Sequence, residues 1–413
     1  MINNRIIVNR INIKTNIAND SFWFFLIVVF LIIEYGRPMD IIPGWGSLRP
    51  AMIVSILLIL SWFITGKIAQ ARSRQTLMMV LFILLLAAFI PFARNNRFAY
   101  NQTITMLLYM PFFLSAIIYI NSFERLKKFF NIWMLLMIYL SIKGIIGKGI
   151  GGSSFLSDEN DFSLLMNMML PFGYFLFMYE KEFKKKMLYL ASSLLAVISV
   201  VASSSRGGFV GLLSVIIVIW LFSPKKILSL LLAGLLATAI YYSADQKYWA
   251  EMSTITNTED STAKQRMDSW TAGWDMFKDN PFGVGGGNFI VRFPEYQPET
   301  MTRGMWGRAA HSLWFTLLPE LGIFGILIYG LLLFYNLRDI NWLRKFKKYP
   351  NNDIRYAYYL SLSFIASFAG YFASGTFLSV LYYPHYFYIT AMIIVTRKLV
   401  AQKKIDREYS EIV

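Results

Sequence analysis

The stretch that decides the fold is His311-Ser-Leu-Trp-Phe-Thr-Leu-Leu-Pro-Glu-Leu-Gly-Ile-Phe-Gly325, where a polar interval gives way to an apolar run. The interval before it, residues 243–310, is the longest hydrophilic part of an otherwise apolar chain. One of only two histidines, His311, therefore stands at the point where the chain is expected to enter a membrane. The other apolar runs are expected to form a scaffold for this junction.

The composition indicates a membrane protein. Of the 413 residues, 56% are hydrophobic and only 15% are charged, against about 25% in typical soluble domains. The apolar residues fall in runs of about 15 to 20, which cross a hydrocarbon core as helices and are too long for barrel strands. We therefore predict an all-α, polytopic helical bundle embedded in a lipid bilayer.

Hydropathy predicts about twelve spans, of which the first two are short enough to lie partly in the interface. The chain then divides into residues 1–242 with nine spans, the loop 243–310 with an amphipathic helix, and residues 311–413 with three spans and a tail. The expected spans are 21–33, 51–64, 76–92, 104–120, 129–146, 162–179, 187–202, 208–222, 227–242, 311–335, 358–375 and 380–396.

The charge pattern predicts the orientation. The net charge of +16 comes from alternate short loops, such as Lys184-Lys-Lys186. Membrane orientation explains positive charge in alternate loops better than nucleic-acid binding does. Residues 243–310 instead carry nine acids against seven bases. We expect both termini in the cytoplasm, the long loop outside, and no nucleic-acid partner. The absence of cysteine excludes disulfides and thiolate metal sites.

Arg206 is the first candidate site residue. It lies in Ser203-Ser-Ser-Arg206-Gly-Gly208, a short connection that holds its guanidinium near headgroup depth. The hydroxyl of Ser205 and the glycines offer donors and room for a ligand. The alternative is an arginine that only anchors the helix ends.

A second arginine accompanies an aromatic stripe. Arg266, Trp270, Trp274 and Phe277 recur at helical spacing, which suits a helix lying in the interface with its arginine facing a phosphate. The alternative is a surface helix with a solvated arginine. Arg303 and Arg308 are weaker candidates of the same kind.

His311 is the candidate general base. An ordinary histidine has a pKa of about 6.5, which suits proton abstraction at neutral pH. The alternative is that His311 only caps a helix or forms a hydrogen bond in the membrane interface. Glu320 is an acid inside a span and should face the bundle interior as a packing or supporting group.

Two polar clusters complete the candidate set. The acids of Asp158-Glu-Asn160-Asp161 could bind a divalent cation or, as we favour, cap a helix, and Asn160 could contact sugar or pyrophosphate. The glycines of Gly283-Val-Gly-Gly-Gly-Asn-Phe289 are expected to form a tight turn.

Two arginines, a histidine and an aromatic shelf at the outer leaflet suggest an anionic lipid diphosphate as the ligand. Guanidinium groups pair bidentately with phosphate oxygens. Arginine charge could stabilise the departing diphosphate while a histidine deprotonates an acceptor hydroxyl, so we expect a metal-independent reaction without a cofactor.

These motifs, with Asn280-Pro-Phe-Gly283 and Ala310-His-Ser-Leu-Trp314, resemble the O-antigen ligase and polymerase superfamily of bacterial membrane glycosyltransferases. The resemblance implies a GT-C-like bundle of about twelve spans in the bacterial inner membrane, with a large periplasmic loop after the ninth. It also implies that Arg206 and Arg266 bind undecaprenyl diphosphate carrying the glycan, and that His311 is the catalytic base. Ser312 stands where many members have asparagine.

The resemblance leaves the acceptor open. A ligase uses lipid A core, a polymerase uses another lipid-linked repeat unit, and a protein-glycosylating relative uses a side-chain hydroxyl. A transporter or flippase for the lipid-linked glycan belongs to a different class. We find no internal repeat of the kind transporters commonly carry, and the polar candidates gather on one face, which favours an enzyme.

Overall fold

The computed structural model describes residues 20–153, 156–223, 261–299 and 307–412, together with scattered positions between 225 and 253. Within these residues the regular secondary structure is helical, which confirms the all-α prediction. Six of the described helices are long and apolar enough to cross a membrane, by length and composition. Those six segments are Trp45–Thr65, Asn96–Tyr119, Phe123–Ile146, Glu159–Tyr179, Phe183–Ala202 and Trp314–Arg344.

Every predicted span except 227–242, which lies mostly outside the described residues, coincides with a helix. The total of twelve spans remains a prediction. The α-helices are α2 (Ser21–Leu31), α3 (Pro50–Thr65), α4 (Arg74–Phe89), α5 (Asn96–Tyr119), α6 (Phe123–Ile146), α7 (Glu159–Tyr179), α8 (Phe183–Ala202), α9 (Arg206–Phe222), α12 (Ser261–Asp279), α13 (Phe289–Arg292), α14 (Trp314–Arg344), α15 (Asn352–Gly375) and α16 (Pro384–Ile412).

Several helices begin earlier than hydropathy predicts, because their first turns are polar and capped. The Asn95 side chain accepts the backbone N–H of Phe98 at the start of α5, and the Ser122 side chain does the same for Arg125 in α6. Such caps satisfy donors that the helix itself leaves unpaired. Apolar runs therefore locate these helices but miss their first turns.

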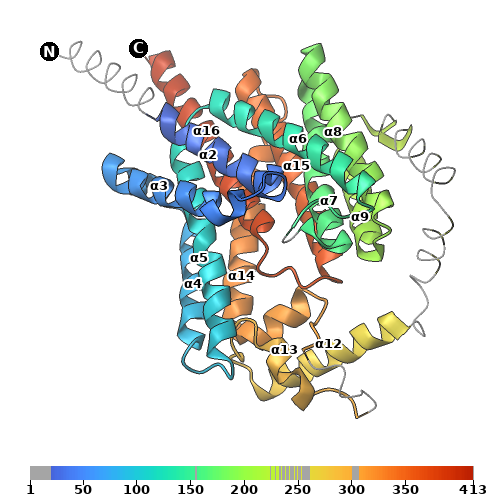
Figure 1. Ribbon diagram of the computed structural model, residues 1–413. Coiled ribbons are helices and arrows are strands. Elements are labelled where there is room, and N and C mark those ends of the chain that lie inside the picture. The colour runs from blue at the N-terminus through green and yellow to red at the C-terminus, as the bar shows by residue number, and fades with distance from the viewer. Residues whose placement is uncertain are drawn as a thin grey trace.

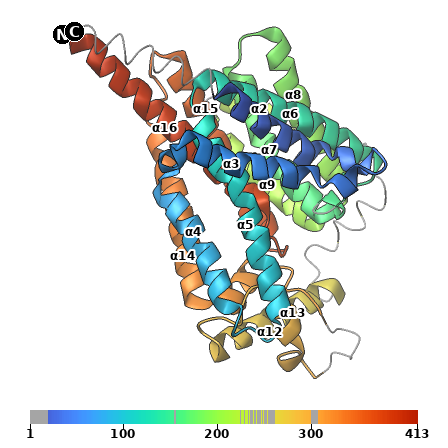
Figure 2. The same cartoon turned by 60° about the vertical axis from the view of Figure 1, so that its left-hand side comes forward.

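The helices pack in two groups. In the first, α7 is central and packs against α8, α9 and α15, and nearly all its side chains from Phe162 to Leu176 are buried. In the second, α14 packs along α4, and α5 packs along α16 (Figure 2). Helices α12 and α13 lie together at one end of the bundle (Figure 1).

The opposite end holds the start of α2 and the end of α16 (Figure 1). Ion pairs join elements there: Lys67 bonds Asp20 at 2.7 Å, and Lys127 bonds Asp353 at 2.8 Å. The basic connections that contain Lys67 and Lys127 thus lie away from α12 and α13. Which end faces the cytoplasm remains a prediction.

Helix α14 is broken, and a loop fills the break. Pro319 cannot donate a helical hydrogen bond, and Gly322 has φ 58° and ψ −156°, a conformation essentially limited to glycine. The loop after α12 supplies replacement partners. The N–H of Val284 donates to the Pro319 carbonyl at 2.9 Å, and the N–H of Ile323 donates to the Pro281 carbonyl at 3.0 Å. This exchange joins α12 firmly to α14.

Candidate active site

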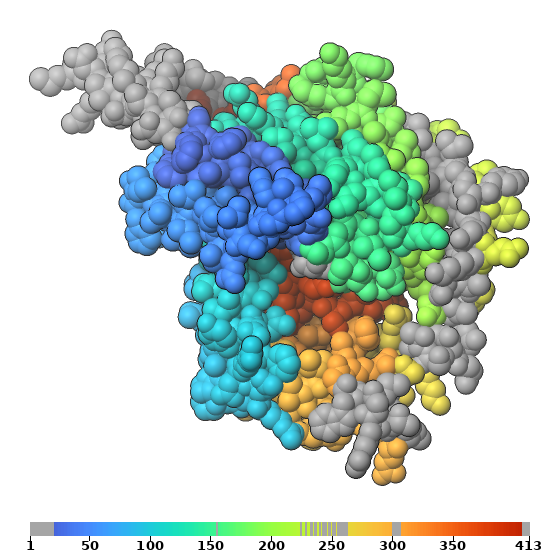
Figure 3. Space-filling view, in the orientation of Figure 1, coloured from blue at the N-terminus to red at the C-terminus, as the bar shows by residue number. Residues whose placement is uncertain are grey.

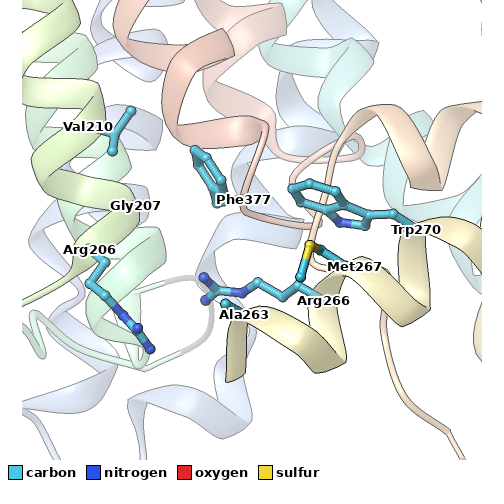
Figure 4. Close-up of a pocket in the computed structure, with 8 residues that line it drawn as sticks. All are labelled: Arg206, Gly207, Val210, Ala263, Arg266, Met267, Trp270 and Phe377. Carbon is cyan, nitrogen blue, oxygen red and sulfur yellow. The ribbon is translucent and has the colours of Figure 1, made fainter. Parts of the chain in front are cut away.

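Arg206 and Arg266 lie on opposite walls of one cavity of about 190 Å³. Figure 4 shows both guanidinium groups reaching into the space between α9 and α12, with Trp270 and Phe377 forming an apolar wall beside them. The cavity joins three elements that are distant in sequence: the start of α9, the first half of α12 and the turn after α15. The remaining lining residues are Gly207, Val210, Ala263 and Met267.

Arg206 is positioned by a capped helix start. The Ser205 side chain caps α9 by accepting the N–H of Gly208 at 2.9 Å, and its hydroxyl donates to Asn160 Oδ1 at 2.6 Å. Ser204 adopts a left-handed φ of 52°, which is uncommon outside glycine and frequent at functional sites. Ser205 and Asn160 therefore hold the Arg206 turn against α7.

Close packing fixes this end of α9 further. A Cβ on Gly208 would lie 2.3 Å from the Ser163 Oγ, so only glycine allows α9 to approach α7 so closely. The Asn167 side chain donates to the Gly208 carbonyl at 2.7 Å. These contacts restrict the base of the Arg206 side chain.

Arg266 lies on α12 beside the face of the helix that packs against the rest of the protein. That face carries Ser269, Ala272 and Met276, which are buried. Residues four apart are offset by about 40° around a helix, so Arg266, Trp270 and Trp274 turn progressively away from it. Trp274 is accordingly 47% exposed, whereas Trp270 stacks on Phe315 with ring centroids 5.4 Å apart. The predicted aromatic stripe thus divides into a packed part and an exposed part.

Trp270 also holds the segment that carries His311. Its indole N–H donates to the Ala310 carbonyl at 3.1 Å. One residue later, His311 adopts a left-handed φ of 47°. The N–H of Leu313 then donates to the Gly375 carbonyl at 2.7 Å, which ties the segment to the end of α15. The histidine is thus fixed on both sides.

Arg308 bonds the same segment to α12. Its Nε donates to Ser269 Oγ at 2.9 Å and its Nη1 donates to Gln265 Oε1 at 2.7 Å. Partial burial is the main reason that its pKa is lowered, and the nearby Asp268 opposes that shift. Arg308 therefore holds the loop while adding positive charge to the site.

The surroundings of His311 favour its neutral form. Loss of hydration lowers its pKa, the positive charges of Arg266 and Arg308 lower it further, and Asp158 opposes them. A neutral imidazole can accept a proton. Helix α14 begins only at Trp314, with Leu313 at its N-cap position, so the helix-cap role considered for His311 is wrong. The interfacial hydrogen-bonding role stays a prediction.

Glu320 lies in the interior, as predicted, with 3% of its surface exposed. Its carboxylate accepts the N–H groups of Gly287 at 2.8 Å and Phe289 at 3.2 Å, and the hydroxyl of Tyr382 at 2.6 Å. It therefore anchors the glycine turn to the broken helix and is absent from the cavity lining. The tight turn itself is confirmed, because Gly283, like two more of its glycines, has a positive φ.

The acids at the start of α7 act as a cap. Asp158 Oδ1 accepts the N–H groups of Asn160 at 2.9 Å and Asp161 at 3.2 Å, which confirms the favoured interpretation. Among the residues that the structure describes, no group of three or more histidines and acids could hold a metal ion. Arg303 lies outside the described residues.

Sequence reasoning missed Phe377 and the residues that clamp the His311 segment. Phe377 follows the last apolar turn of α15, and no motif distinguishes it from other aromatics there. Gln265 and Ser269 flank Arg266 at spacings of one and three residues, so a search for polar partners on α12 could have found them. His385, the second histidine, is buried, bonds the Tyr35 hydroxyl at 3.0 Å and is absent from the cavity lining.

Comparison with known families identifies this region. Residues 191–330 match the family model described as O-antigen ligase, a range that contains Arg206, Arg266 and His311. No curated protein matches the chain. The family match supports a glycosyltransferase function of the O-antigen ligase or polymerase type. Residues 191–330 of the chain are thus similar to the O-antigen ligase family.

Proposed function

We propose that the protein transfers a glycan from undecaprenyl diphosphate to an acceptor hydroxyl at the external face of the bacterial inner membrane. The observation that carries this proposal is the shared cavity of Arg206 and Arg266, with His311 within electrostatic reach of Arg266. The family match makes a glycan substrate the natural choice for a cavity with two arginines.

The donor's diphosphate binds between the two guanidinium groups. Each can form paired, charge-assisted hydrogen bonds to phosphate oxygens. Arg206 is also the first residue of α9, where the positive end of the helix dipole favours an anion. Trp270 and Phe377 offer the apolar surface that the lipid or sugar part of the donor needs.

Transfer exchanges one bond at the sugar's anomeric carbon for another. The acceptor oxygen forms a new bond to this carbon while the bond to the phosphate oxygen breaks. The acceptor's proton passes to His311, and undecaprenyl diphosphate leaves with the electron pair of the broken bond. Arg206 and Arg266 stabilise the negative charge that develops on the leaving group.

The lowered pKa of His311 suits this role, since the imidazole must be neutral to accept the proton. Arg266, which binds the anion, is also a reason that the base stays neutral. When the diphosphate binds, its negative charge should offset the charge of Arg266 and make the proton easier for His311 to accept.

One feature supports the external face. The site lies at the end of the bundle away from the basic loops, and such loops mark the cytoplasmic side of a membrane protein (Figure 1). Undecaprenyl-linked glycans and their acceptors would then meet at the outer leaflet.

The test is transfer by purified protein in detergent, supplied with lipid-linked glycan and candidate acceptors. We expect Arg206→Ala, Arg266→Ala and His311→Ala to abolish transfer while still inserting in the membrane. Arg292→Gln is the control, because Arg292 pairs with Glu295 at 2.7 Å outside the cavity. Wild-type rates from all three site variants would reject the site, and glycan movement without a new glycosidic bond would indicate a transporter.

The acceptor distinguishes a ligase from a polymerase and from a protein-glycosylating enzyme. Glycan profiling of a deletion strain separates the branches. Loss of lipid-attached chains indicates a ligase, loss of long chains indicates a polymerase, and loss of glycoproteins indicates a protein-glycosylating enzyme.

A further inference from the structure

A second cavity lies at the other end of the bundle. It has a volume of about 420 Å³ and is enclosed by the ends of α9 and α14 and by α15. Helix α14 begins beside His311 and ends at Arg344, which lines this cavity, so the two sites are separated by the length of that helix (Figure 1). The space-filling view shows how far the bundle extends between its two ends (Figure 3).

The polar wall of this cavity is strongly basic. Its charged lining residues are Lys226, Arg344, Lys345 and Lys347, and its lining includes no carboxylate. Across the described part of the chain, no ion pair to a carboxylate is formed by these four cations. The lysines 67, 127, 185 and 403, in contrast, each pair with an acid. Four uncompensated cations around one space favour an anionic ligand.

The cations are positioned by aromatic side chains. The Arg344 guanidinium lies 4.3 Å from the centre of the Phe222 ring and donates to Asn341 Oδ1 at 3.2 Å. The Lys226 ammonium lies 5.0 Å from the centre of the Trp220 ring. Such contacts reduce the conformational freedom that these long side chains would lose when a ligand binds.

The other wall is apolar and continues onto the outer surface of the bundle. Leu221, Phe222 and Leu362 line the cavity, and Leu221 is 47% exposed on α9. The apolar run of α9 predicts a membrane span, and exposed apolar residues on such a span face lipid chains. The cavity therefore offers cations to a headgroup and an apolar surface to the chains attached to it.

We propose that this cavity binds the headgroup of an anionic phospholipid in the leaflet opposite the glycan-transfer site. Basic pockets between helices on the cytoplasmic side are a known way to hold acidic headgroups. A zwitterionic phospholipid presents a cation as well as a phosphate, so it should bind more weakly. The bound lipid would join α9, which begins with Arg206, to α14, which begins three residues after His311. The proposal is independent of the proposed function, because it concerns lipid binding alone.

The experiment measures thermal unfolding of the purified, delipidated protein in a non-ionic detergent. We expect phosphatidylglycerol to raise the unfolding temperature by at least about 2 °C over phosphatidylcholine, because a ligand of the native state stabilises it. Arg344→Gln/Lys345→Gln should abolish the difference. Lys128→Gln/Lys184→Gln, which removes two charges outside the cavity lining, should retain it.

Three results would overturn the proposal. They are equal effects of the two lipids on the wild type, loss of the difference in the control variant, and the same rise with inorganic phosphate, which would indicate a soluble anion. If Arg344→Gln/Lys345→Gln fails to fold, Arg344→Lys/Lys345→Arg should keep the lipid effect. Native mass spectrometry of the wild type should then show more bound phosphatidylglycerol than phosphatidylcholine from an equal mixture, and equal binding would refute selectivity.

Discussion

Gly322→Ala tests whether the broken helix supports the site. A Cβ at this position would lie 2.3 Å from the Phe282 carbonyl carbon and 2.4 Å from the Pro281 oxygen. The backbone at Gly322 also has a positive φ that alanine rarely adopts. The substitution must therefore straighten α14 or displace the loop that fills its break.

The loss of folding stability caused by Gly322→Ala has two parts. An alanine held in this conformation costs about 1–3 kcal/mol. Displacing the loop loses three backbone hydrogen bonds, from Val284 to Pro319, from Gly285 to Glu320 and from Ile323 to Pro281, at about 0.5–1.5 kcal/mol each. We expect a destabilisation of about 2.5–7.5 kcal/mol, together with loss of transfer as α12 moves.

Gly330→Ala provides the matched control. Gly330 lies in the same helix, and a Cβ there meets nothing within 4 Å, so the change should be neutral or stabilise the helix by up to about 1 kcal/mol. The assay is thermal unfolding of both variants in detergent, followed by tryptophan fluorescence. Equal unfolding temperatures for Gly322→Ala and Gly330→Ala would refute the reasoning.

Three further substitutions address the site. Trp270→Phe removes the bond to the backbone beside His311 and should lower the transfer rate at least about tenfold through misplacement, whereas Trp274→Phe on the exposed side should not; equal rates in a steady-state assay would contradict this. Arg308→Gln removes a positive charge that lowers the pKa of His311, so this pKa should rise. As the pH is lowered, the variant should therefore lose transfer activity at a higher pH than the wild type does. Arg308→Lys keeps the charge and should keep the wild-type pH profile. Glu320→Gln puts an amide donor against a backbone N–H and should destabilise the protein by about 2–4 kcal/mol in thermal unfolding; an unchanged unfolding temperature would argue against its anchoring role.

The sequence predicted the helices well because hydropathy is a property of whole segments. It missed polar first turns such as that of α5, since capping by Asn95 depends on local geometry. The break at Gly322 was also missed. Pro319 and Gly322 are visible in the sequence, but the loop that satisfies the freed backbone comes from 40 residues earlier, at Pro281-Phe-Gly283.

The candidate site was predictable in its charged residues and not in its supports. Arg206, Arg266 and His311 stand out because charge is costly at a membrane boundary and histidine is rare in this chain. The sequence showed Trp270 only as one member of an aromatic stripe. Its hydrogen bond to the Ala310 carbonyl could not be predicted, because no sequence pattern marks such a bond. Phe377 enters the cavity through the packing of α15, which sequence reasoning cannot supply.

The most direct test of the account is to measure donor binding and transfer separately in the same purified variants. Arg206→Gln and Arg266→Gln should each weaken the binding of undecaprenyl diphosphate by roughly 10- to 150-fold, the value of a charged hydrogen bond. His311→Ala should bind it as tightly as the wild type and form no product. Wild-type donor affinity in both arginine variants, or product formation by His311→Ala at the wild-type rate, would contradict the account.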